Sequence, residues 1–151
     1  MKLAEALLLR SEYQNKIDNL HQRIIINLKV QENEKPHEDP NALIFELMKL
    51  NDELCELVKK INKKNNEVLL ENGQTITEAL AERDMLIKKR NLLSVIVTNA
   101  GQKEFRLTHS EVKIHVTIDI AKIQKEIDAI SQKYRQIDTQ IQSQNWTVDI
   151  D

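Results

Sequence analysis

One stretch with a seven-residue apolar repeat decides the fold: residues 120–141 read IAKIQKEIDAISQKYRQIDTQI. Its apolar side chains follow alternating steps of three and four residues, at Ile120, Ile123, Ile127, Ile130, Tyr134, Ile137 and Ile141. This spacing places all of them on one side of a helix and is typical of a coiled-coil seam. We therefore predict a long fourth helix whose seam is buried, either in the core or between copies of the chain.

A third helix is predicted upstream of this stretch. Thr75 and Glu78 have the spacing of a capping box at its start. Asn99-Ala100-Gly101 is expected to end it, because glycine readily takes the left-handed conformation at a helix C-terminus. Its apolar residues are Ile76, Leu80, Ile87, Leu93, Ile96 and Val97.

Two further helices are predicted in the N-terminal half. The first runs from Lys2 to about Gln31, with leucines and isoleucines at helical spacing. The second begins at Asp39-Pro40, since aspartate suits the N-cap and proline the first turn. It is expected to end near Asn65-Asn66.

Two short β elements are expected between the helices. Asn72-Gly73 is a strong signal for a two-residue hairpin turn. Beyond the third helix, apolar and polar residues alternate from Val112 to Ile118, which is the period of a half-buried strand.

These elements predict a mostly all-α protein, a long-helix antiparallel bundle or coiled coil of about four helices with a small β-hairpin or strand element. The composition agrees, because the chain has only 2 Gly and 2 Pro and is 3% aromatic. Its 151 residues suffice for a single helical domain over 1–151.

The charge and cysteine content restrict the compartment and the partners. A formal net charge of -2 gives no global attraction to nucleic acid or to anionic membranes. Cys55 is the single cysteine, which suits a reducing compartment. No apolar run has the length of a secretory or membrane-spanning segment, so we expect a cytoplasmic protein.

No catalytic, metal or cofactor site is predicted, and we expect a protein that is not an enzyme. The four histidines, His21, His37, His109 and His115, form no metal-binding motif, and Cys55 lacks the surroundings that activate a thiolate. The two glycines cannot build a phosphate-binding loop.

Four residues are candidates for a partner surface: Lys88, Lys89, Arg90 and Trp146. The first three form a basic cluster, and a second one runs from Lys59 to Lys64. Both clusters are explained first by the helix dipole, which favours cations in the C-terminal part of a helix. Trp146 lies in an expected polar tail from Gln142, and an indole there should pack onto something.

Several segments together resemble a family of small bacterial proteins of uncharacterised function that are commonly labelled septicolysin. They are Lys2 to Leu7, Asp39-Pro40-Asn41, Asn72-Gly73, Thr75 to Asp84, and Gln142 to Thr147 with its Asn-Trp-Thr end. The resemblance covers essentially the whole chain. Its label implies membrane damage, whereas the single tryptophan and the lack of an aromatic, cationic amphipathic helix argue against it.

We expect a non-enzymatic coiled-coil oligomer that acts as a scaffold or binds a protein partner, with the chain itself as its first partner. A membrane-damaging protein is one alternative. The other is a helical hairpin that binds RNA through its lysines, similar to the coiled arm of seryl-transfer-RNA synthetases. The composition, with its net charge of -2, argues against both nucleic acid and membrane as partners.

Overall fold

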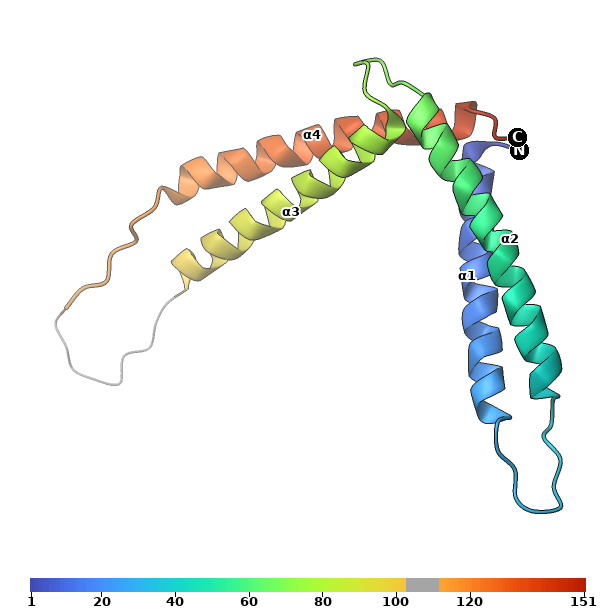
Figure 1. Cartoon of the computed structure of the whole chain (residues 1–151). Helices are drawn as coiled ribbons and strands as arrows, with labels where there is room; N and C mark the ends of the chain where they lie inside the picture. The colour runs from blue at the N-terminus through green and yellow to red at the C-terminus, as the bar shows by residue number, and fades with distance from the viewer. Residues whose placement is uncertain (103–111) are drawn as a thin grey trace. The chain divides into compact units, whose positions relative to one another are not determined.

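The computed structural model describes residues 1–102 and 112–151, and four long helices make up most of them (Figure 1). These are α1 (Leu3–Ile26), α2 (Pro40–Glu67), α3 (Ile76–Gly101) and α4 (Ile120–Thr147). The predicted mostly all-α fold with four helices is confirmed. Contacts group the chain into two compact units, Met1–Ile76 with Gln142–Asp151, and Thr77–Ile141. The single domain expected over 1–151 stays a prediction.

In the first unit, α1 and α2 lie side by side as a helical hairpin (Figure 1). Its core contains a cluster of buried Leu20, Ile24 and Leu43, with Leu47 and Leu50 packed against it. These residues belong to the apolar stripes that the spacing predicts for the two helices. The spacing of apolar residues in the sequence therefore accounts for the packing of α1 against α2.

α1 ends five residues before the predicted end at Gln31, because Asn27 closes the helix with its side chain. The Asn27 amide donates to the Arg23 carbonyl at 2.8 Å and accepts from the backbone N–H of Glu38 at 3.2 Å. Arg23 also pairs with the Glu38 carboxylate, with Nε donating to Oε2 at 3.0 Å. The buried Asn27 thus ties the connection between α1 and α2 to the end of α1.

Both ends of the described chain belong to the first unit, where they pair with each other. The backbone N–H of Leu3 donates to Val148 at 2.9 Å, and that of Ile150 donates to Met1 at 2.9 Å. The Lys2 ammonium lies 3.0 Å from the Asp149 carboxylate. The expected tail from Gln142 was wrong, since α4 continues to Thr147 before the chain reaches this pairing.

The β elements predicted from the sequence do not form in the described part of the chain. Around Asn72-Gly73 the turn is present, with Gly73 at φ 83°, but the flanking residues make a single isolated bridge between Leu69 and Thr75. Residues 112–117 have no regular structure and are exposed. A strand needs a neighbouring strand for its backbone hydrogen bonds, and the β-bridges among residues 1–102 and 112–151 form elsewhere, at Lys2–Asp149 and Leu69–Thr75.

Aspartates begin two of the helices. Asp39 accepts from the backbone N–H of Asn41 at 3.0 Å, with Pro40 in the first turn, as predicted. Asp119 accepts from the backbone N–H of Lys122 at 3.1 Å and starts α4 at Ile120. Each carboxylate satisfies a backbone donor that has no partner within the helix.

Candidate interaction surface

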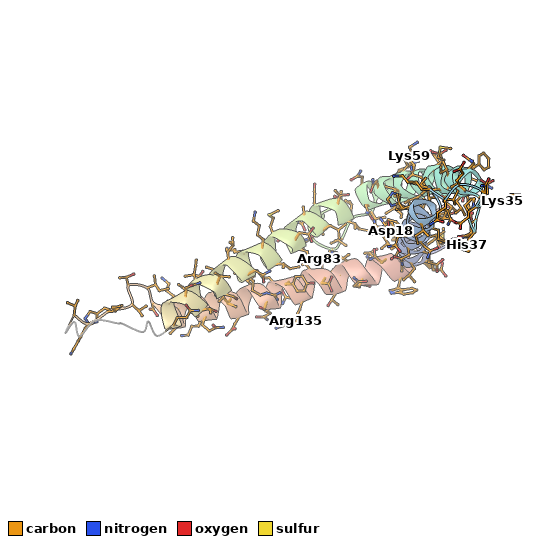
Figure 2. All side chains as sticks on the ribbon, turned by 90° about the horizontal axis from the view of Figure 1, so that it is seen from below. Asp18, Lys35, His37, Lys59, Arg83 and Arg135 are labelled. Carbon is orange, nitrogen blue, oxygen red and sulfur yellow. The ribbon has the colours of Figure 1, made fainter. Side chains whose placement is uncertain are left out.

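In the second unit, α3 and α4 form a hairpin, and the contacts across its seam include an ion pair and an arginine that lies over a tyrosine ring. Arg83 of α3 donates to the Asp138 carboxylate of α4 at 2.8 Å. Seven residues, or one heptad, further along α3, the Arg90 guanidinium lies 5.7 Å from the centre of the Tyr134 ring. Figure 2 shows Arg83 on α3 where the helix faces α4. Arg135, three residues before Asp138, is exposed on the other side of α4.

The isoleucine seam of α4 is covered within a single chain. Ile127, Ile130, Ile137 and Ile141 are buried. The other seam residues, Ile120, Ile123 and Tyr134, are half-buried. Because α3 already packs along this side of α4, the seam belongs to the core of the hairpin. Self-association through an apolar face would need a different face.

α3 has an apolar side that is left exposed. Met85, Leu92, Val95 and Ile96 are 62, 57, 60 and 46% exposed and recur at helical spacing on the side turned away from the Arg83 and Arg90 contacts. They adjoin a groove of about 560 Å³ lined by Asp84, Ile87, Lys88, Asn91, Leu92, Val95 and Ile96. We call Met85, Leu92, Val95 and Ile96 the outer stripe.

The sequence analysis named Ile96 among the apolar residues of α3 and did not single out the other three residues of the outer stripe. The available signal was that the apolar residues of α3 fall on more than one side of the helix. An apolar side of a helix is expected to be covered. Here one side meets α4, and the outer stripe is left in solvent.

The three basic residues predicted as one partner surface are separated by the structure. Lys88 and Lys89 are exposed, and Lys88 lines the groove beside the outer stripe. Arg90 is half-buried and lies over the Tyr134 ring, so it contacts α4 and does not face a partner. Trp146, in the first unit, is 59% exposed near the end of α4.

The lysines at the end of α2 lie among carboxylates. Lys59 donates to Glu56 at 2.6 Å, which raises the lysine pKa, and Lys63 lies 3.9 Å from Glu67. A hollow of about 230 Å³ is lined by Lys60, Lys63, Lys64, Glu67, Ile150 and Asp151. A hydrogen bond from Lys2, aided by the field of Lys64 among others, lowers the pKa of Asp149. The cluster is thus partly neutralised by the protein's own acidic residues.

The remaining candidates for chemistry are dispersed. Cys55, His21, His37 and His115 are exposed, and His109 lies outside the described residues. Among residues 1–102 and 112–151, no group of three or more His, Cys, Asp or Glu side chains is placed to hold a metal ion. Within the same residues, no helix is long and apolar enough to cross a membrane.

Two comparisons with known proteins match the chain along its length. A family described as a family of unknown function, DUF6847, matches residues 10–150. A crystal structure of a functionally unknown conserved protein from Corynebacterium diphtheriae is similar over 100% of this chain and 99% of that chain, with 36% identity and a TM-score of 0.92. No curated protein matches. These matches agree with a small bacterial family of unknown function, and neither description mentions septicolysin.

Proposed function

This chain belongs to the family of unknown function DUF6847, and we propose that it works as a non-enzymatic coiled-coil scaffold whose copies associate through the outer stripe of α3. The observation that carries the proposal is that α3 is apolar on two sides. One side is covered by α4. The other exposes Met85, Leu92, Val95 and Ile96.

The groove beside the stripe favours a second copy of the chain as its occupant. Its charged lining residues are one carboxylate, Asp84, and one ammonium, Lys88. Such a face carries no net charge, so two copies do not repel each other across it. A nucleic acid would instead need several uncompensated cations in one place.

A two-fold arrangement suits this surface, because helices that pair by the same face commonly do so around a symmetry axis. In an antiparallel pair of α3 helices, apolar residues of one copy would meet the lysine stem and apolar residues of the other. The aliphatic part of Lys88 can pack there while its ammonium stays in water.

Light scattering during size-exclusion chromatography tests the proposal with a matched pair of variants. Leu92→Gln combined with Ile96→Gln should lower the mass toward that of a single chain without changing the helix content. Leu8→Gln is the control, because Leu8 is 60% exposed on α1 and lies outside the stripe. Equal masses for all three proteins would refute a role for the stripe.

The two other classes of function predict different results with the same material. A lytic protein should release dye from liposomes, and an RNA-binding protein should shift RNA on a gel at physiological salt. RNA binding that is lost when Lys88 and Lys89 are both changed to Glu would replace the proposal, since both ammonium groups are exposed.

A further inference from the structure

We infer that residues 113–119 form a two-stranded antiparallel ladder with the same residues of a second copy. The segment reads KIHVTID and leads directly into α4. It alternates polar and apolar side chains at the period of a strand, yet residues 113–117 have no regular structure in the single chain. The inference rests on the proposed function in one respect, that the partner is a second copy.

The apolar side chains of this segment are left in solvent. Ile114, Val116 and Ile118 are 58, 52 and 36% exposed. In a strand, all three would project to the same side, because residues two apart share a face. In a single chain, this apolar side of the segment has no sheet to pack in. Pairing with the same segment of a second copy would remove its apolar surface from water.

One register makes the segment complementary to itself. With Val116 opposite Val116 of the second copy, Ile114 lies opposite Ile118 on the apolar face. On the other face, His115 lies opposite Thr117, and Lys113 lies opposite Asp119. Because the pairing is symmetric, the lysine–aspartate pair occurs twice, and opposite charges directly across a ladder stabilise it.

Asp119 ends the ladder, and it does so at both ends because the pairing is symmetric. Asp119 is the N-cap of α4, and N-cap residues have extended backbone geometry that can close a strand. Its carboxylate accepts one hydrogen bond, from Lys122, which leaves acceptor capacity for a lysine of the second copy. Ile120 is already helical, so pairing stops there.

Two charge variants test the register. Lys113→Glu places carboxylates opposite each other in a pair of identical chains, and Asp119→Lys places two lysines opposite each other. Each variant alone should weaken self-association, by about threefold to thirtyfold in Kd. An equal mixture should recover it, because every cross-copy pair then joins a carboxylate to a lysine.

Sedimentation velocity on each variant and on the mixture gives the readout, with circular dichroism to check that α4 remains folded. A mixture that sediments as the average of its two parts would overturn the inference. Val116→Cys in a Cys55→Ser background supplies a second measurement that leaves the cap of α4 intact. That variant should form a disulfide between copies on oxidation, whereas Gln132→Cys in the same background should not; equal cross-linking would also count against the ladder.

The outcomes separate this inference from the proposed function. If the glutamine variants of the outer stripe lower the mass while the charge variants do not, the ladder is wrong and the scaffold stands. If the unaltered protein has the mass of a single chain at every concentration, both fail.

Discussion

Arg83 and Asp138 join α3 to α4 by a hydrogen-bonded ion pair of 2.8 Å between residues 55 positions apart. The side chains are 23 and 31% exposed, so the pair is partly shielded from water. Together with Arg90 over Tyr134, it fixes which residues of the two helices face each other. An all-isoleucine seam on its own would tolerate sliding by a heptad, since each repeat is alike.

Removing the arginine should therefore weaken the hairpin. Arg83→Met should lower the free energy of unfolding by about 1 kcal/mol, since Asp138 loses its partner while the stem packing is kept. Arg135→Met is the control on the exposed side of α4. A double-mutant cycle with Asp138→Asn in urea denaturation isolates the pair. A coupling energy indistinguishable from zero would show that the contact does not hold the register.

The buried seam gives a larger effect. Ile127 and Ile130 lie in the first half of α4 and are each 7% exposed. Changing either to Ala should cost roughly 2 to 5 kcal/mol, because the lost methyl groups leave a cavity. Gln132→Ala, on the exposed side, should cost less than about 0.5 kcal/mol. Equal thermal midpoints for Ile130→Ala and Gln132→Ala would mean that α4 packs by another face.

The side chain of Asn27 should contribute measurably to the stability of the first unit. It is buried, and it bonds both to Arg23 and to the backbone of Glu38. Asn27→Ala should destabilise the first unit by about 1 to 2 kcal/mol, because the Glu38 N–H loses its acceptor. Asn15→Ala, at an exposed position of α1, serves as the matched control in thermal denaturation. A similar loss in both variants would argue against this capping role.

The same connection should respond to acid. The hydrogen bond from Arg23 lowers the pKa of Glu38 below its ordinary value of 4.5. A lowered carboxyl pKa stabilises the fold above the pKa of the unfolded chain, and this contribution is lost as pH falls through the folded-state pKa. Glu38→Gln should therefore melt below the unaltered protein at neutral pH and converge with it in acid. A constant difference across that range would exclude the pair as its cause.

Much of the fold was predictable because local signals and apolar spacing agreed. Asp39-Pro40 marks the start of α2, and the α4 seam identifies its buried side. The end of α1 was missed because Leu28 continues the apolar pattern, whereas the side chain of Asn27 ends the helix through a contact with the distant Glu38. Tertiary contacts of this kind leave no periodic trace in the sequence.

The candidate surface was less predictable for a related reason. Periodicity identifies a buried side only when one side of a helix is apolar, and α3 has Leu93 and Val97 half-buried but Leu92 and Ile96 exposed. The strand expected from Val112 to Ile118 failed in the single chain because alternation specifies side-chain direction and does not supply a neighbouring strand.

The mass of the unaltered protein in solution tests the central claim most directly. Sedimentation equilibrium over a range of micromolar concentrations should give a mass above the 17.6 kDa of one chain, rising with concentration toward an integral multiple. A mass of 17.6 kDa at every concentration would contradict the account, because the outer stripe of α3 would then remain in solvent without a second copy to cover it.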